Sequence, residues 1–494
     1  MSTILAAEVG TTSTTVMIIQ GGVILTSASS KEYHPTTKKG GYSRQNPKVW
    51  WDAFCQAVDI AVHKVGIQIR QEIDCIVVGG QMHGLVPNGT DLANLWNDST
   101  AVKQSEILLQ LADSQARLGL VGKKGLLNHT GNIPSPNLTA LKLMQMADEE
   151  PNKFKGLKCF TLPAGAITKK LIGEAVIDPS DASGTMLWDI QGRKWSEQMI
   201  QLVGIPNRLL PRVVESLEVA GKLGTKVASQ LGLNAGISVL AGGADQSESA
   251  LGMGVIPSNE GIISFTMGTS GVITAALAEA RPDARLNTFA HVRGMITFLC
   301  TNACGDAQRF IRDMLGIKSY AMMDELASEV PVGSNGVMFT PLLSGSRMLD
   351  CYRPNGHLLG MSMSTTQADI CRAVQEGIIM EAGMGLDVMR EKDIPVKEVR
   401  LGGGGAKSDH LAQMVADILG VTVVVPEVTE TTVLGAGIRG TVAMGDFGSI
   451  EEACTSLVKP AKSFKPRKGK HDAYAKPYEE FSNVMRLVTA ESLD

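Results

Sequence analysis

Apolar runs of strand length alternate with amphipathic stretches of helical length along much of the chain. Residues 4–19 are predicted to form two apolar strands around a short polar turn, and residues 73–78 form a further apolar strand. Between them, apolar residues recur every three or four positions from Pro47 to Val65, which predicts an amphipathic helix. Strands that alternate with helices in this way indicate an α/β protein.

A short motif near the start of the chain has an approximate counterpart in the middle. Residues 7–13 (AEVGTTS) and 265–271 (FTMGTSG) each place a Gly-Thr turn between apolar flanks, which predicts a strand, a turn and a strand in both places. The repetition suggests two similar domains that face each other across a cleft. A strand ends and a helix begins near residues 243–250, which marks the boundary. We therefore divide the chain into 1–246, 247–445 and a C-terminal helical extension, 446–494.

Both turns have the chemistry of an anion site. Glycine lets backbone N–H groups approach an anion closely, and threonine and serine hydroxyls are further donors. Two such turns could hold the phosphates of one nucleotide from opposite sides, whereas two ordinary β-hairpins are the alternative. The candidate residues are Gly10, Thr11 and Thr12 in the first turn, and Gly268, Thr269 and Ser270 in the second.

Four consecutive glycines, 402–405, separate a predicted strand, 396–401, from a predicted amphipathic helix. They would let a flat ring pack directly on the main chain, and a flexible connection is the alternative. The run matches neither standard nucleotide motif, because Ala406 stands where a P-loop needs glycine and Lys407 where the dinucleotide fingerprint needs its third glycine. A strand, 421–425, follows the helix, however, so a dinucleotide-dependent oxidoreductase stays open as a hypothesis.

Asp245 lies where a predicted helix begins, within the stretch 242–248 (GGADQSE). One interpretation is a capping box, with Asp245 as the N-cap and Glu248 three residues later. The other is catalytic, because a helix N-terminus favours an ionised carboxylate, which can accept a hydroxyl proton. The two roles are compatible.

Polar and aromatic residues follow the strand 73–78 in two short segments, 81–84 (QMHG) and 96–98 (WND). Taken alone, His83 is typical of a structural histidine and Asp98 of a turn. Together the segments offer several hydrogen-bonding groups and an indole face, which suit a polyhydroxylated ligand. They also follow the carboxyl end of a strand, where ligands bind in open α/β sheets.

Composition argues against several other classes of function. The formal net charge of -4 and the pI near 6.1 do not fit a protein that coats nucleic acid, and the short basic stretch 462–470 is predicted to be a solvated linker. We find no apolar run of about 18 residues and no signal-peptide pattern, so we expect a cytoplasmic protein without a membrane partner. The eight scattered cysteines predict reduced thiols.

In their order along the chain, these motifs resemble those of the FGGY carbohydrate kinases, and most closely the xylulokinases. The resemblance spans about residues 4–445. It rests on the first Gly-Thr-Thr turn, Met-His-Gly, Trp-Asn-Asp, Gly-Gly-x-Asp and the glycine run, together with Leu162-Pro163, 180–185 and Trp195-Ser196. It implies two ribonuclease H-like domains of the actin-like ATPase type, which close over ATP, Mg²⁺ and a small sugar and exclude water.

The resemblance also implies a role for each matched residue. Asp245 would be the general base that accepts the proton of the sugar hydroxyl, and Glu8 would lie near Mg²⁺ and the phosphates. The two Gly-Thr turns would face the phosphates, with the nucleotide bound mainly by the second domain. The adenosine would pack against Gly403, Gly404 and Gly405. The sugar would be bound by Met82, His83, Trp96, Asp98 and Gln246.

Four positions depart from the family pattern. Glu8 replaces an aspartate, Gln246 an asparagine, Thr100 an arginine and Ser346 a glutamate. Geometry around Mg²⁺ is strict, and a misplacement of about 1 Å can lower a rate on the order of a hundredfold. We expect phosphorylation of a pentulose, most simply xylulose to xylulose 5-phosphate. The alternatives are another ketose or polyol kinase of the family, or a low-activity sugar or nucleotide sensor of the same fold; a homodimer is left open.

Overall fold

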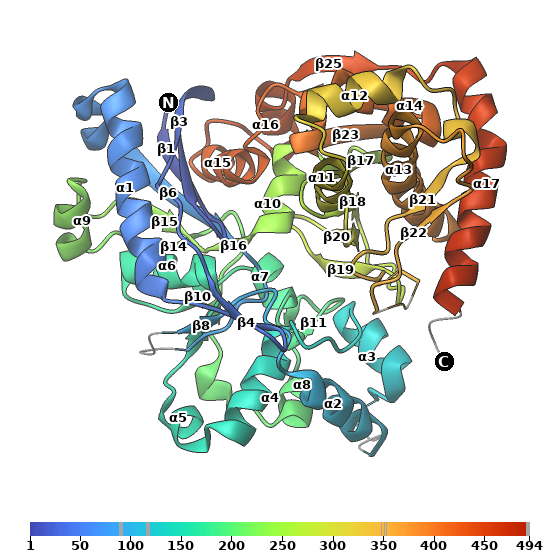
Figure 1. Cartoon of the computed structure of the whole chain (residues 1–494). Coiled ribbons are helices and arrows are strands. Elements are labelled where there is room, and N and C mark those ends of the chain that lie inside the picture. Colours follow the sequence, from blue (N-terminus) through green and yellow to red (C-terminus); the bar gives the residue numbers. More distant parts are fainter. Residues whose placement is uncertain (88–91, 115–118, 347, 350, 352, 491–494) are drawn as a thin grey trace.

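The computed structural model describes residues 1–87, 92–114, 119–346, 348–349, 351 and 353–490. Two large mixed sheets form the centres of two lobes, which stand side by side in Figure 1. We call the lobe built around β1 the first lobe and the lobe built around β17 the second lobe. A mainly helical insertion lies below the first sheet in the same view.

The first sheet has seven strands in the order β14-β15-β6-β1-β2-β3, with β16 beside the end of β6. Strands β1 to β3 form an antiparallel meander, whereas β6 and β15 continue the sheet in parallel with β1. The bounds are β1 (Thr3–Val9), β2 (Thr14–Gln20), β3 (Val23–Ser29), β6 (Ile73–Gly80), β14 (Val219–Lys222), β15 (Ser238–Leu240) and β16 (Gly243–Ala244).

The second sheet repeats this plan in the order β19-β20-β18-β17-β23-β24-β25. The antiparallel strands β17, β18 and β20, with β19 on the outer side of β20, lie beside two parallel strands, β23 and β24. The shared connectivity confirms the two similar α/β domains predicted from the repeated turn. The bounds are β17 (Ile262–Met267), β18 (Gly271–Leu277), β19 (Asn287–Ala290), β20 (Met295–Thr301), β23 (Glu398–Gly403), β24 (Thr422–Pro426) and β25 (Pro460–Phe464).

Helices cover both faces of the first sheet. The predicted helix α1 is confirmed, and it begins where Pro47 occupies the first helical position and the Asn46 side chain accepts the Lys48 N–H at 2.9 Å. It shares one core with α6, whereas α15 and α16 share another core with the opposite face. The bounds are α1 (Pro47–Val65), α6 (Pro163–Ile172), α9 (Thr225–Leu231), α15 (Thr431–Ala443) and α16 (Ile450–Leu457).

Helix α15 packs unusually closely on its neighbours because glycines face them. A Cβ atom on Gly435 would lie 1.9 Å from the backbone oxygen of Glu248 in α10 (Asp245–Gly252), and one on Gly440 would lie 2.4 Å from a methyl of Ile4 in β1. Any larger residue at these positions would push the helix away. Helix α15 is therefore part of the first lobe, although it was predicted to belong to the second domain, 247–445.

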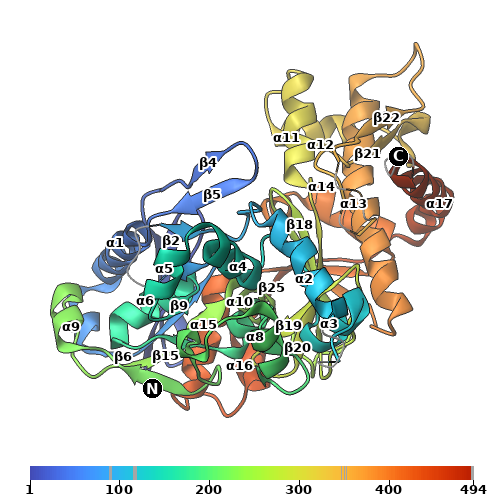
Figure 2. The same ribbon diagram turned by 90° about the horizontal axis from the view of Figure 1, so that it is seen from below.

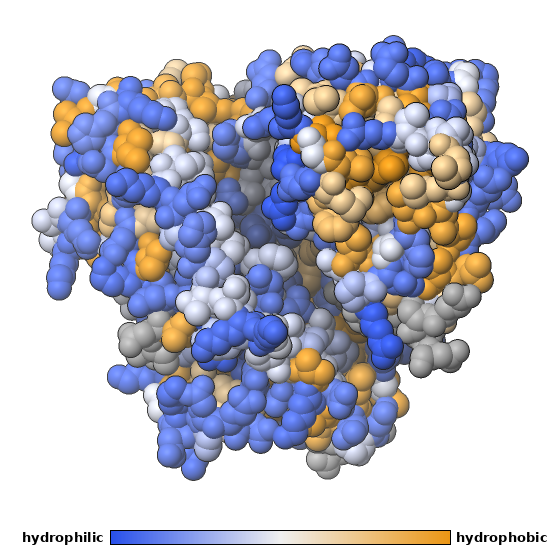
Figure 3. Space-filling view, viewed as in Figure 1, coloured by the Kyte–Doolittle hydropathy of each residue, from blue (hydrophilic) through white to orange (hydrophobic). Residues whose placement is uncertain are grey.

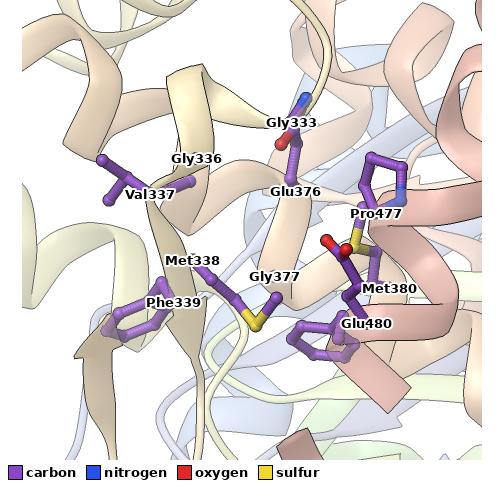
Figure 4. A pocket seen from close by; sticks show the side chains of 12 residues that line it. Gly333, Gly336, Val337, Met338, Phe339, Glu376, Gly377, Met380, Pro477 and Glu480 are labelled. Atoms are coloured by element: carbon purple, nitrogen blue, oxygen red, sulfur yellow. The ribbon is translucent and has the colours of Figure 1, made fainter. Parts of the chain in front are cut away.

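The second lobe is organised around α13, which begins at a capping box formed by Thr366 and Asp369. Glu376 of this helix accepts hydrogen bonds from Arg372 Nε (2.8 Å) and from the Tyr474 hydroxyl of α17 (2.9 Å). Figure 4 shows the small cavity of about 70 Å³ beside them, between α13, α17 and β21. The bounds are α11 (Gly305–Met314), α12 (Tyr320–Ser328), β21 (Met338–Thr340), β22 (His357–Leu359), α13 (Gln367–Glu391), α14 (Asp409–Leu419) and α17 (Lys468–Ala490).

The insertion between β6 and β14 has its own apolar core. Its helices are α2 (Val102–Ser114), α3 (Gly122–Thr130), α4 (Thr139–Glu149), α5 (Pro151–Gly156), α7 (Pro179–Ser183) and α8 (Glu197–Val203). Its short strands are β7 (Val86–Pro87), β8 (Ala93–Asn94), β9 (Phe160–Thr161), β10 (Val176–Ile177), β11 (Trp188–Asp189), β12 (Lys194–Trp195) and β13 (Arg212–Val213). A hairpin of β4 (Thr36–Lys38) and β5 (Tyr42–Gln45) pairs with β8 and projects beside α1 in Figure 2.

The segment after residue 445 is not only helical. Between α16 and α17, β25 pairs with β24 and completes the edge of the second sheet, with Phe464 opposite Val423. The basic stretch 462–470 is largely exposed, as expected, but it is not a linker, because its first residues belong to β25 and its last to α17. No helix in the described ranges is both long and apolar enough to cross a membrane.

Candidate active site

Three of the predicted segments meet at one edge of the first sheet. β1 and β16 both lie parallel to β6 and pair with its last residues. Gly10, Gln81 and Asp245 are the first residues after these strands, so they lie side by side at the carboxyl end of the sheet. This edge is where ligands bind in open α/β folds.

The first Gly-Thr turn is fixed by side chains from other segments. Its Gly10 oxygen accepts the Tyr33 hydroxyl at 2.9 Å and Gln81 Nε2 at 3.4 Å. The Thr11 hydroxyl oxygen accepts the indole N–H of Trp96 at 3.1 Å, while Thr12 is exposed. Trp96, which is 42% exposed, is thereby held beside the turn predicted to face the phosphates.

Asp245 is the first residue of α10 and is half-buried. The capping-box prediction is wrong: Ala244 occupies the N-cap position, and the Asp245 carboxylate accepts the N–H of its neighbour Gln246 at 2.8 Å. Burial raises the pKa of Asp245 to about 6, and hydrogen bonds from the backbone of Gln246 and Met82 oppose this shift. A carboxyl group with such a pKa is mostly ionised at neutral pH and is more basic than an exposed aspartate.

Glu248, the expected capping partner, forms a buried ion pair instead. It contacts the guanidinium of Arg439, which also lies 3.8 Å from Asp178 and donates to the backbone oxygens of Ser216 and Ala241, both at 2.9 Å. Both partners of the pair are about 1% exposed. The pair ties α15 to α10, and therefore fixes the helix that carries Asp245.

Glu8 lies near the end of β1, close to other carboxylates. Burial raises its pKa to about 7, and the negative charge of Asp245 and, more weakly, of Glu430 raises it further, while a hydrogen bond with Thr432 opposes the shift. Glu430 at the N-cap of α15 and Asp245 at the start of α10 thus bring negative charge close to Glu8 of β1. Such an arrangement favours a bound cation.

The loop 81–84 is held in an uncommon conformation. His83 has a φ of +64°, in the left-handed region, and its Nδ1 lies 2.8 Å from the backbone oxygen of Gly184. Its ring packs against Phe289 with a centroid separation of 5.2 Å, and Met82 is 4% exposed in the adjoining apolar cluster. Both predicted sugar residues therefore lie on a loop that packing and a hydrogen bond hold in place, and the Met82 backbone hydrogen-bonds to Asp245.

Asp98 is fully buried at the end of the neighbouring loop. Its carboxylate accepts the Ser43 N–H at 3.1 Å and the Thr100 hydroxyl at 2.6 Å, and Arg44 Nε lies 3.5 Å away. Thr100, which replaces an arginine of the family pattern, is thus a direct partner of Asp98. A direct contact between Asp98 and sugar stays a prediction, because protein donors surround the carboxylate in this structure.

The second turn and the glycine run also come together. Met267, just before Gly268, pairs with Gly403, and a Cβ atom on Gly403 would lie 2.6 Å from the Met267 oxygen. Gly403 is therefore needed for close packing of the two strands, while Gly404 is exposed. The N-terminus of α11 joins them, because the Gly305 N–H donates to the Gly268 oxygen at 2.8 Å. The neighbouring residues Thr269, Ser270 and Gly405 complete the predicted nucleotide side.

A hollow runs between the two lobes in the space-filling view, and hydrophilic residues line much of it (Figure 3). Two family models match the chain: the N-terminal domain of the FGGY family of carbohydrate kinases over residues 3–252, and the C-terminal domain over residues 263–444. The first match contains the first sheet, and the second contains the second sheet apart from its edge strand β25. The chain belongs to the FGGY family of carbohydrate kinases. It is therefore an ATP-dependent carbohydrate kinase, and the dinucleotide-dependent oxidoreductase hypothesis is wrong.

Relatives extend over the whole length of this FGGY kinase. A xylulose kinase of Bacillus subtilis is 30% identical over 497 residues, which cover 98% of this chain and 97% of the relative. The solved xylulose kinase of Rhodospirillum rubrum has a TM-score of 0.90 at 23% identity with full coverage of both chains. A gluconate kinase of Lactobacillus acidophilus has a TM-score of 0.88 at 21% identity, with coverage of 99% and 98%. The predicted two-domain, actin-like fold is confirmed.

The sequence interpretation missed several groups that shape the site. Tyr33 and Thr432 hold or approach predicted site residues, and Arg439 anchors α10. Gln81 belongs to the predicted segment 81–84, but no separate role was predicted for its side chain. The buried position of Arg439 could have been predicted, because Arg439 is the one charged residue in the otherwise uncharged, glycine-rich segment 431–443. A buried charge in that setting requires a buried counter-charge.

Proposed function

We propose that this FGGY kinase phosphorylates xylulose to xylulose 5-phosphate, with Asp245 as the general base. The choice of xylulose as the substrate rests on the match to the Bacillus subtilis xylulose kinase along nearly the full length of both chains. The fold does not decide it, because the solved xylulose and gluconate kinases superpose almost equally well.

Asp245 is suited to the proton transfer by its position. Backbone N–H groups of Met82 and Gln246 hold its carboxylate at the edge of the sheet, and its raised pKa makes it a better proton acceptor than an exposed aspartate. It accepts the proton of the sugar hydroxyl as the hydroxyl oxygen bonds to the γ-phosphorus and the bond from that phosphorus to the bridging oxygen of ADP breaks. A loose transition state needs only a weak, well-placed base.

The remaining residues orient the two substrates. Backbone N–H groups and hydroxyls of the two Gly-Thr turns would bind phosphate oxygens from opposite lobes. Gly404, which is exposed, would leave room for the adenosine on the second lobe, while Gly405 beside it packs on the Met267 side chain. Met82, His83, Trp96 and Gln246 would enclose the sugar on the first lobe. Closure of the lobes would exclude water, which would otherwise compete as the phosphoryl acceptor.

Magnesium would reach this site together with the ATP phosphates. No cluster of three or more His, Cys, Asp or Glu side chains is arranged to hold a metal within the part of the chain that the structure describes. The negative charges of Asp245 and, more weakly, Glu430 nevertheless raise the pKa of Glu8, and a divalent cation beside Glu8 would favour its ionised form. Bound Mg²⁺ would neutralise phosphate charge, and Glu8 would hold it directly or through water.

Replacement Glu8→Gln should raise the Mg²⁺ concentration for half-maximal activity about tenfold or more, because the neutral amide is a poorer ligand of the cation. Glu8→Asp keeps the charge and is the matched control, with a smaller change. The measurement is a Mg²⁺ titration of ADP release at saturating ATP and sugar. An unchanged Mg²⁺ requirement in Glu8→Gln would remove Glu8 from the metal site.

The pH profile provides a second test of the base. Because Asp245 must be ionised to accept a proton, kcat/KM for the sugar should fall about tenfold per pH unit below an inflection near pH 6. The measurement is initial velocity at limiting sugar between pH 5 and 8 with Mg²⁺ and ATP saturating. A flat profile down to pH 5 would contradict the raised pKa of the base.

The product itself tests the proposed reaction. Phosphorus NMR of the reaction mixture should show a new phosphomonoester coupled to the protons on the fifth carbon of xylulose. A phosphate on another carbon would refute the regiochemistry, and inorganic phosphate alone would indicate ATP hydrolysis in place of transfer.

A further inference from the structure

Helix α4 of the insertion carries a buried polar stripe. Thr139, Lys142 and Gln145 follow one another at intervals of three, so they share one face of the helix, and they are 0%, 2% and 7% exposed. A lysine is almost never buried to this extent unless its ammonium is well paired. The polar groups of the stripe must therefore have hydrogen-bonding partners inside the protein.

The stripe binds the two loops that carry the predicted sugar residues. Lys142 Nζ donates to the backbone oxygen of His83 at 2.9 Å and to that of Leu95 at 2.6 Å. These oxygens belong to the loops 81–84 and 95–100, which we call the sugar-side loops. One ammonium thus joins the Met82–His83 turn to the Trp96–Asp98 turn.

The neighbours of Lys142 on the stripe reinforce the same two loops. The Thr139 hydroxyl donates to the His83 oxygen at 3.1 Å, and Gln145 Oε1 lies 3.0 Å from the Thr100 hydroxyl, which donates to Asp98 at 2.6 Å. Two donors therefore converge on the oxygen of His83, the residue with a left-handed backbone conformation. Such a conformation persists only where its surroundings fix it.

Electrostatics agree with this role. Burial lowers the pKa of Lys142 to about 7, and the negative charge of buried Asp98 opposes the shift. The Asp98 carboxylate, which belongs to the loop 95–100, thus favours the ammonium form of Lys142. Without Lys142, the oxygens of His83 and Leu95 would lose a charged donor, and charge-assisted hydrogen bonds are the stronger ones.

We propose that Lys142 is a positioning residue that fixes the spacing of the two sugar-side loops, and so sets sugar affinity without touching the sugar. The proposal rests on the sugar site proposed above. It implies that the helical insertion, and not the first sheet alone, determines how the sugar is held.

The test is Lys142→Met, which keeps an unbranched side chain but removes the charged donor. We expect KM for sugar to rise about tenfold or more, while KM for ATP changes less than twofold and the equilibrium binding of ADP is retained. Lys103→Met is the matched control. Lys103 bridges α2 to Asp148 of the same helix α4 at 3.0 Å, and its side chain is 69% exposed, so both KM values should stay within twofold.

A second variant keeps the proposal testable if Lys142→Met does not fold. Thr139→Val preserves shape and removes one donor to His83, so it should raise KM for sugar about threefold with KM for ATP unchanged. Equal increases in both KM values, or no change in KM for sugar, would overturn the positioning role. Both variants are assayed with whichever sugar the wild-type enzyme phosphorylates, so a different substrate would refute the xylulose proposal and leave this one intact.

Discussion

Replacement of Asp245 by asparagine should lower kcat about a thousandfold while leaving sugar and ATP binding nearly unchanged. The amide keeps the shape of the side chain at the first position of α10, but it cannot accept the hydroxyl proton, and general-base catalysis typically contributes 10²–10⁴-fold. The measurements are single-turnover rates of ADP formation and calorimetric titrations with sugar and with ADP. Asp245→Ala should behave similarly.

Asp409→Asn is the matched control for this experiment. Asp409 is also the first residue of a helix that follows a parallel strand, but it is exposed and pairs with Lys462 on the surface. Its replacement should change kcat less than twofold. If Asp245→Asn kept near-normal turnover, Asp245 would not be the base.

Arg439→Met should destabilise the folded protein by about 3–5 kcal/mol, because it leaves Glu248 and Asp178 buried without their positive partner. Chemical denaturation followed by tryptophan fluorescence measures this change. Since α15 and α10 lose their ion pair, activity per folded molecule should fall as well. A loss below about 1 kcal/mol would contradict a structural role for the pair.

The same variant should show a defined pH dependence. Burial raises the pKa of Glu248 to about 7 even with Arg439 present, so the folded state binds a proton more tightly than the unfolded chain. Stability therefore falls as pH rises from about 4.5 through the folded pKa, and the deficit of Arg439→Met should be larger at pH 8 than at pH 5.5. Arg212→Met breaks an exposed pair with Glu174 and should cost less than about 1 kcal/mol at either pH.

Much of the fold was predictable because its signals are local. The helix Pro47–Val65 has both a terminal proline and an apolar face, and both Gly-Thr turns lie between apolar strands. The short repeated turn correctly indicated two similar domains. The return of α15 to the first lobe was not predictable. Its packing on the first sheet depends on contacts between residues more than 400 positions apart in the chain, such as Gly440 and Ile4.

The site was predicted less completely, for a related reason. The spacing of Asp245 and Glu248 fitted a capping box. In the structure Glu248 instead forms an ion pair with Arg439, because a buried guanidinium is stable only beside a negative charge. Asp98 was chosen for its motif, and only the fold reveals how Ser43 and Thr100 surround its carboxylate. Lys142 escaped notice because its partners are backbone oxygens, which no side-chain motif identifies.

We propose that this FGGY kinase transfers the γ-phosphoryl group of ATP to xylulose. The most direct test is coupled ADP release with ATP and Mg²⁺ across xylulose, ribulose, xylitol, ribitol, fuculose, rhamnulose, gluconate and glycerol. We predict a kcat/KM for xylulose at least tenfold above that for any other member of the panel. A higher value for another member would contradict the proposed substrate, and no sugar-dependent release with intact ADP binding would favour the low-activity sensor of the same fold.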